Sequence, residues 1–229
     1  PGDRLTLRDA LYSTLLGSDN VSALTIASFV GRDLVSRRGS GTPIAAFVSE
    51  MNNLARSLRM TKTRFTAPHG LDAGNAVSTS CALDMALLGM YSMQNPAFCY
   101  IVSQASRRIG VQSQTKGTTM YDISNNNKMM STPGVDGIKA GSSRAAGQCL
   151  LLSATRNAIA RRSPQTGTEV IYPQRMIIAV LGTGERYSLA RQMLNTGWRV
   201  WENWQASGMD MKDPKEFVQL PVKSGTEKR

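Results

Sequence analysis

Apolar residues recur at helical spacing through most of the first hundred positions and again near the end of the sequence. Between Leu7 and Leu16 they stand three or four residues apart, and Thr6 precedes them as a candidate helix cap with Asp9 three residues further on. Pro43 stands at a position where the first turn of a helix tolerates proline. The pattern predicts helices at residues 7–16, 21–35, from 43, 79–93, from 96 and 186–205.

Beyond Ile101 the helical spacing fades, and short β-like segments stand between glycines and asparagines. Strands are predicted at residues 137–140, 148–155 and 175–181, with an exposed hairpin or insertion at 159–168 and a loop at 63–74. The last two strands are continuous apolar runs, which is typical of central strands in a covered sheet. A helical block followed by strands and a closing helix predicts an α+β domain, with an antiparallel sheet covered by helices.

Length and polarity define the domain organisation. The 229 residues allow one sizeable domain with a short appendage. We expect this domain at residues 1–205, followed at 206–229 by a polar linker and the start of a small C-terminal β-domain, because residues 217–222 are strand-like. No apolar run approaches the roughly 18 residues that a membrane-spanning helix needs.

The charge balance favours anionic partners. Lys and Arg number 27 against 16 Asp and Glu, giving a net charge of +11. The arginines are scattered, aromatic residues are only 6% and no nucleic-acid-binding motif occurs, which argues against nucleic acid. A bacterial cell envelope with its anionic polymers suits the charge, and a merely solvated basic surface is the equally weighted alternative.

Cysteine and histidine usage gives no metal or cofactor site. Cys81, Cys99 and Cys149 form no C-x-x-C pair, and the single histidine, His69, has no metal-ligand spacing to them. We expect each cysteine to be an isolated buried thiol, with a pairing of Cys81 and Cys99 left open.

Three segments stand out together. Ser18-Asp19-Asn20 lies between two predicted helices, residues 134–141 read Gly-Val-Asp-Gly-Ile-Lys-Ala-Gly, and residues 145–150 begin the next strand. Singly these are weak, because a Ser-x-Asn tripeptide is more often a turn or a helix end. Their order and the 121 residues between Ser18 and Lys139 (139 − 18) carry the information.

In this order the motifs resemble those of penicillin-binding serine D-alanyl-D-alanine carboxypeptidases, which carry S-x-x-K, S-x-N and K-T-G. Residues 5–23 resemble the family's second-motif region, residues 65–72 its Pro-His-Gly-Leu-Asp loop, and residues 133–154 its third-motif hairpin. The resemblance implies a β-lactamase/transpeptidase-like fold with a helical subdomain. It also implies a hydrolase of the bacterial periplasm or cell envelope. Such an enzyme removes the terminal D-alanine of peptidoglycan stem peptides through an acyl-enzyme, and it binds β-lactam antibiotics.

The resemblance also implies roles for individual residues. Ser18 would pass a proton to the leaving D-alanine, Asn20 would hold the substrate backbone, and Lys139 would polarise Ser18 and attract the substrate carboxylate. The remaining implied substrate-binding residues are Ala140, Gly141, Ser142, Ser143 and Arg186. Among these the Ser142 N–H is half of the oxyanion hole and Arg186 binds carboxylate, although a surface arginine in a first helical turn is an equal alternative. His69 is expected to be structural.

Two departures from the family pattern stand out. Ser113-x-x-Lys116 fits the nucleophile motif by letters only, in a polar stretch without helical spacing. We therefore expect the true S-x-x-K upstream, a complementary N-terminal fragment as partner, and no activity from these residues alone. Ala140 stands where the family has threonine, which removes a hydrogen bond worth about 1.5–3 kcal/mol to a charged group. Substrate capture should be weaker, with Ser142 or Ser143 partly substituting.

Two other functions remain open. A non-catalytic peptidoglycan-binding module of this fold would explain Ala140 and the missing nucleophile. A class A β-lactamase shares Ser-Asp-Asn, but the Pro-His-Gly-Leu-Asp loop and the lack of a clear Glu-x-x-Leu-Asn deacylation loop argue against it. A peripheral association with the membrane is also left open.

Overall fold

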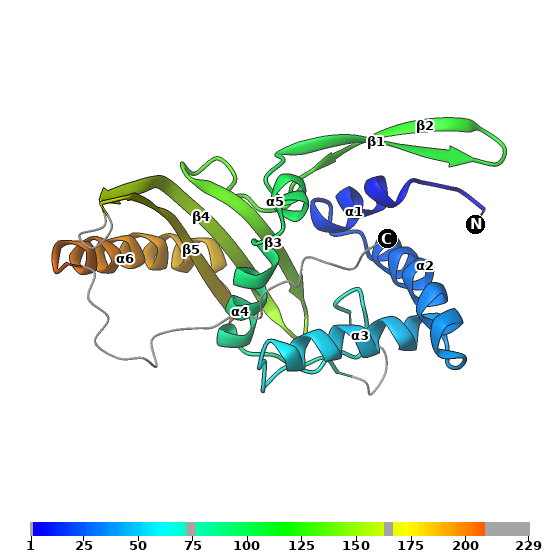
Figure 1. Ribbon diagram of the computed structural model, residues 1–229. Coiled ribbons are helices and arrows are strands. Elements are labelled where there is room, and N and C mark those ends of the chain that lie inside the picture. The colour runs from blue at the N-terminus through cyan, green and yellow to red at the C-terminus, as the bar shows by residue number, and fades with distance from the viewer. Residues whose placement is uncertain (1, 72–76, 163–166, 209–229) are drawn as a thin grey trace.

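The computed structural model describes residues 2–71, 77–162 and 167–208 (Figure 1). Six helices and five strands occur in these ranges: α1 (Leu7–Leu15), α2 (Asn20–Arg38), α3 (Pro43–Ser57), α4 (Ala82–Ser92), α5 (Pro96–Val102), β1 (Ser106–Ser113), β2 (Gly117–Ser124), β3 (Val135–Ser143), β4 (Gly147–Arg162), β5 (Glu169–Thr183) and α6 (Arg186–Ala206). The predicted strand at 217–222, and with it the proposed start of a second domain, lies outside the described residues.

All six predicted helices are present, with two boundaries shifted by about a turn. The second helix ends at Arg38 rather than at Val35. Thr6 caps α1, since its Oγ1 accepts a hydrogen bond from the backbone N of Asp9 at 3.0 Å. The fourth helix begins at Ala82 rather than at Thr79. The backbone groups of Thr79 and Arg64 exchange two hydrogen bonds of 2.9 Å, which hold Thr79 in an extended bridge and delay the start of the helix.

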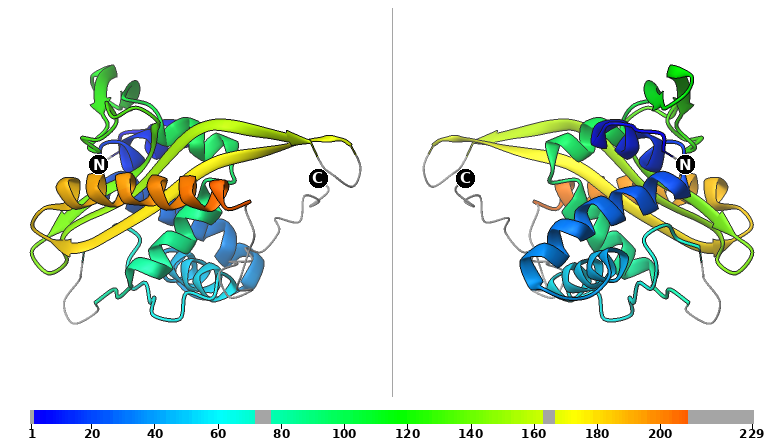
Figure 2. Two further views of the ribbon diagram at one scale, coloured as in Figure 1. Left: turned by 90° about the vertical axis from the view of Figure 1, so that its left-hand side faces the viewer. Right: turned by 90° about the vertical axis from the view of Figure 1, so that its right-hand side faces the viewer.

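The three later strands form an antiparallel sheet in the order β3-β4-β5, so that β4 is central. All three are longer than predicted, and the hairpin expected at 159–168 is the distal part of β4 and β5 together with residues outside the described ranges. Helix α6 lies along one face of the sheet, while α4 and α5 lie on the other (Figures 1 and 2). The α6 face buries an apolar cluster that includes Leu150, Leu152 and Trp198.

Strands β1 and β2 form a separate hairpin that projects beside α1 (Figure 1). The sequence pattern did not assign these strands, because nearly all of β2 is exposed and has no apolar alternation. The hairpin is anchored by Ile109, which packs with Tyr12 and Leu16 of the α1 segment. Ser113 and Lys116 lie at its turn, where Ser113 pairs with Gly117.

Helices α2 and α3 pack closely against each other at Gly31. A Cβ built on Gly31 would come within 2.0 Å of the carbonyl oxygen of Pro43, so this contact requires glycine. Helix α3 is joined to α4 through Leu58 and Leu87. The helical block therefore reaches the sheet through α4.

The three cysteines are free and half-buried, so Cys81 and Cys99 are not paired. The Sγ of Cys99 donates to the carbonyl of Met93 at 3.1 Å.

Candidate active site

Ser18 stands in a strained turn between α1 and α2. Its φ of 63° is in the left-handed region, which costs a non-glycine residue on the order of 1–3 kcal/mol. Asp19 holds this turn, because its carboxylate accepts hydrogen bonds from the backbone N of Val21 at 3.1 Å and of Ser22 at 3.0 Å. Asn20 is consequently the first residue of α2. The geometry presents Ser18 and Asn20 at the N-terminal end of that helix.

The Asp19 carboxyl remains ionised in this arrangement. Burial raises its pKa, but hydrogen bonds from Ser22, from the N–H of Val21 and from the Ser13 hydroxyl outweigh that effect, and the pKa is lowered overall. An ionised carboxylate is also favoured at a helix N-terminus.

Lys139 lies on β3 opposite Leu151, and its Nζ donates to the carbonyl of Ala140 at 2.6 Å. Burial, together with the positive charge of Arg186, lowers the pKa of Lys139 to about 8. In the part of the chain that the structure describes, neither Lys139 nor Arg186 forms an ion pair with a carboxylate.

Arg186 is the first residue of α6 and reaches across to β3. Its Nη1 donates to the carbonyl of Gly141 at 2.6 Å, and its guanidinium lies 4.9 Å from the centre of the Tyr187 ring. The Nε of Arg186 is buried and has no hydrogen-bond partner among the described residues. Lys139 and Arg186 are therefore neighbouring cations at residues 139–141, and the described ranges supply neither with a carboxylate counterion.

The other predicted site residues differ in their surroundings. Ala140 is only 4% exposed and packs beside Leu150 in the cluster under α6. Gly141 and Ser142 are exposed. The Ser143 hydroxyl accepts from the backbone N of Ala146 at 3.0 Å and so closes the β3–β4 turn.

A loop that the sequence analysis did not single out joins the two halves of the site. Asn126 donates from Nδ2 to the carbonyl of Gly17 at 2.8 Å, beside Ser18. Asn127 donates from Nδ2 to the carbonyl of Gly137 at 3.1 Å, two residues before Lys139. The run of three asparagines at 125–127 was the available signal, since such side chains commonly bond to backbone groups.

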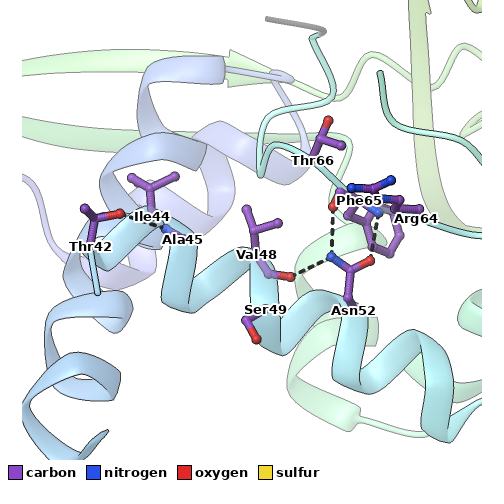
Figure 3. Close-up of a pocket in the computed structure, with 9 residues that line it drawn as sticks. All are labelled: Thr42, Ile44, Ala45, Val48, Ser49, Asn52, Arg64, Phe65 and Thr66. Atoms are coloured by element: carbon purple, nitrogen blue, oxygen red, sulfur yellow. Dashed lines mark hydrogen bonds between the residues drawn. The ribbon is translucent and has the colours of Figure 1, made fainter. Parts of the chain in front are cut away.

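His69 lies in a loop with a structural hydrogen bond. Its Nδ1 accepts from the backbone N of Leu71 at 3.1 Å, and the same loop is held at Phe65 by both ends of the Asn52 amide. Asn52 also lines a shallow cavity of about 550 Å³ between α3 and residues 64–66 (Figure 3). None of the predicted site residues lines this cavity.

The sequence model of the D-alanyl-D-alanine carboxypeptidase family (peptidase family S11) matches residues 1–163, which is more than half of the chain. The chain belongs to this family. The match covers the Ser18 loop, Lys139 and the β3–β4 turn.

Curated relatives and solved structures agree with this assignment. The chain is 28% identical over 209 residues to D-alanyl-D-alanine carboxypeptidase DacC of Escherichia coli, covering 88% of this chain and 43% of that protein. It is 29% identical over 161 residues to the carboxypeptidase of Streptomyces sp. (strain K15), covering 68% and 52%. The chain thus spans about half the length of the curated relatives it matches.

The fold is similar to solved penicillin-binding structures. A mutant of the Streptomyces K15 DD-transpeptidase superposes with a TM-score of 0.69 at 26% identity, over 86% of this chain and 70% of that one. Penicillin-binding protein D2 of Listeria monocytogenes, in its cefotaxime-bound form, gives 0.60 at 25% identity, over 84% and 66%. The predicted transpeptidase-like α+β fold is confirmed.

Proposed function

We propose that residues 1–229 carry the S-x-N and K-x-G half of the active site of a serine D-Ala-D-Ala carboxypeptidase. The observation that carries this is the pair of cations, Lys139 and Arg186, that flank β3 without a counterion in the described residues. Such a pair, with the Arg186 Nε left unbonded, suits the terminal carboxylate of a peptide.

The strand itself supplies the second element of recognition. Within the described sheet β3 is an edge strand, paired only with β4. A stem peptide can add as a further strand along residues 140–142, because main-chain hydrogen bonds there need no particular side chain. Ser142 is exposed, and in this arrangement its N–H would serve the scissile carbonyl as one donor of the oxyanion hole.

The chemistry follows from these placements. The attacking serine of the S-x-x-K segment forms an ester bond to the penultimate D-alanine carbonyl carbon, and the C–N bond to the terminal D-alanine breaks. Ser18 passes a proton to the departing amine, with its hydroxyl polarised by the charge on Lys139. Water then hydrolyses the ester and restores the serine.

The nucleophile comes from a segment other than the described β1–β2 hairpin. Ser113 and Lys116 lie at a hairpin turn, not one helical turn apart, so they cannot act as the buried pair. A complementary N-terminal fragment, whether continuous with this chain or separate, therefore completes the site. Mass spectrometry of protein from its native source tests whether such a fragment is present. A single 24.9 kDa species with no companion peptide would overturn the proposal of a complementary fragment.

The direct test uses protein expressed from its complete reading frame and a peptide ending in D-Ala-D-Ala. Lys139→Gln should reduce D-alanine release at least about 100-fold, since the substrate carboxylate loses its cation and the Ser18 hydroxyl loses the charge that polarises it. Arg191→Gln, an exposed arginine on the same helix as Arg186, is the matched control and should retain activity. Unchanged release by Lys139→Gln would refute the assignment.

One rival function has a specific observation in its favour. Ala140 buries a methyl group where the family carries threonine, and loss of that hydroxyl suits a protein that no longer cleaves peptidoglycan peptide and binds it only weakly through the remaining groups. Binding of the peptide without any D-alanine release would support that function. Rapid turnover of a chromogenic cephalosporin would instead indicate a class A β-lactamase.

The proposal places the protein outside the cytoplasm, where the peptidoglycan stem peptides are, and makes β-lactams its inhibitors. Among the described residues no helix is long and apolar enough to span a bilayer. The net charge of +11 favours a peripheral association with anionic envelope polymers or lipid surfaces.

A further inference from the structure

Three consecutive asparagines after β2 each bond to a different element. Asn125 donates from Nδ2 to the carbonyls of Val102 at 3.1 Å and Gln104 at 3.0 Å, at the end of α5. Its Oδ1 accepts from the backbone N of Asn127 at 2.9 Å. Asn125 therefore shapes the loop and fixes it to the helix that packs under β3.

Asn126 is bonded to the segment that ends in Ser18. Its backbone N donates to the carbonyl of Leu16 at 3.0 Å and its Nδ2 to the carbonyl of Gly17 at 2.8 Å. These two carbonyls follow the last residue of α1, where helix carbonyls have no partner within the helix. The side chain of Asn126 is exposed, so these bonds and not packing define its contribution.

Asn127 is bonded to the strand that carries Lys139. It is 2% exposed, its Nδ2 donates to the carbonyl of Gly137 at 3.1 Å, and its Oδ1 accepts from the backbone N of Met129 at 3.0 Å. The β3–β4 register shifts between Val135 and Gly137, so the ladder alone does not fix this part of the strand.

Tyr187 brings the third site element to the same loop. Its hydroxyl donates to the carbonyl of Asn126 at 3.1 Å and accepts from the backbone N of Lys128 at 3.4 Å. Tyr187 directly follows Arg186 and lies against its guanidinium. One loop thus contacts the neighbours of Ser18, Lys139 and Arg186.

We propose that Asn126 and Asn127 are positioning residues that set the placement of Ser18 relative to Lys139 for proton transfer. The inference rests on the proposed function. Neither amide touches the substrate. Each acts through one backbone carbonyl, and misplacement of a proton-relay pair by about 1 Å is enough to lower a rate on the order of 100-fold.

The test uses Asn126→Asp and Asn127→Asp in the full-length protein. Each change keeps the shape, replaces the Nδ2 donor by a second acceptor oxygen and adds a negative charge, and the control variant adds the same charge. Asn157→Asp, at an exposed amide on β4, is the matched control. Acylation by benzylpenicillin, measured per folded molecule, should fall about tenfold or more in the two loop variants and stay unchanged in the control.

Double-mutant cycles separate positioning from a general structural effect. If Asn126 acts through Ser18, adding Asn126→Asp to the Ser18→Ala protein should not lower its acylation rate further. Likewise, adding Asn127→Asp to the Lys139→Gln protein should not lower its rate further. The inference would be overturned if each change lowered the acylation rate by the same factor in the unaltered protein and in the singly altered protein. Unchanged acylation in the Asn126→Asp variant would also overturn it.

A second readout does not depend on activity. The NMR titration midpoint of the Lys139 ammonium should move by about half a unit or more in Asn127→Leu and not in Asn157→Leu. Leucine removes the donor to Gly137 without adding a charge, so a shift reports a changed placement of β3. Absence of acylation in the unaltered protein would refute the proposed function. The Lys139 titration would still test the positioning role in that case, because an unmoved midpoint would contradict it.

Discussion

At the scale of single residues, the charge state of Lys139 links burial to substrate capture. Its ammonium is half-buried beside Arg186, and both facts disfavour the protonated form. A lysine with an ordinary pKa would remain charged well above the pH of any envelope. Here the pKa of about 8 places the loss of charge close to physiological pH.

The pH profile of acylation should therefore reveal Lys139. Because the charged form attracts the carboxylate, acylation by a penicillin should fall as the pH rises through about 8. Lys139→Arg keeps its charge throughout this range and should show a lower rate without that decline. The profiles are measured between pH 6 and about 10 with a fluorescent penicillin. An identical decline in both proteins would assign the titration to another group.

The hydroxyl missing at Ala140 can be tested with an isosteric pair. Ala140→Thr should raise the acylation rate about tenfold or more if a hydroxyl there bonds the substrate carboxylate. Ala140→Val has the same shape without the hydroxyl, so it measures the cost of crowding next to Leu150. Comparable rates in the two variants would show that the hydroxyl is not used.

At the scale of elements, the Asp19 cap at the start of α2 holds the Ser18 loop, and a separate close contact joins α2 to α3. The left-handed Ser18 is followed at once by the Asp19 cap, which supplies acceptors for the first N–H groups of the helix. The sequence places Asp19 where a cap of α2 is needed. The left-handed backbone of Ser18 depends on where α1 ends, and residue spacing does not give that conformation.

Removing the Asp19 cap should destabilise the protein. Asp19→Ala should lower the free energy of unfolding by about 1 kcal/mol, whereas Asp19→Asn retains an acceptor and should lose less. Since the folded-state pKa of Asp19 is lowered, its contribution is present above pH 3.8 and is lost as the pH falls through the folded value. Urea unfolding at pH 7 and at pH 3 measures both effects. Equal stabilities of the Ala and Asn variants at pH 7 would contradict the capping role.

The α2–α3 contact should not tolerate a methyl group. Gly31→Ala would bring a Cβ within 2.0 Å of a backbone oxygen, so the helices must separate at a cost of about 1–3 kcal/mol. Gly197→Ala on α6 would meet the side chain of Met176, which is flexible and can move aside. Thermal unfolding should show a clearly lower midpoint for Gly31→Ala alone, and equal midpoints would contradict the packing argument.

At the scale of the whole molecule, the sequence predicts the helices well because their apolar residues recur at helical spacing, and it predicts the strands β4 and β5 because they contain continuous apolar runs. Thr6 and Pro43 marked helix starts that the structure retains. The β1–β2 hairpin was missed because β2 is exposed along almost its whole length and carries no apolar period. The start of α4 was missed because a backbone bridge to Arg64, distant in sequence, outweighs local helical preference at Thr79.

The candidate site was predicted by its motif residues but not by its geometry. Ser18 and Lys139 came from motif order, and the pairing of Lys139 with Arg186 as neighbouring cations is a tertiary result. The three asparagines at 125–127 marked a loop that bonds to backbone groups, but their partners could not be derived from the sequence, because they lie as far apart as Gly17 and Gly137.

The intact mass of the full-length protein after exposure to benzylpenicillin tests the central claim most directly. We predict one covalent adduct per molecule, formed at least about 100-fold more slowly in Lys139→Gln, because the cation that anchors the antibiotic's carboxylate is gone. No adduct on the unaltered protein, or adduct formation at the same rate in both proteins, would contradict the account.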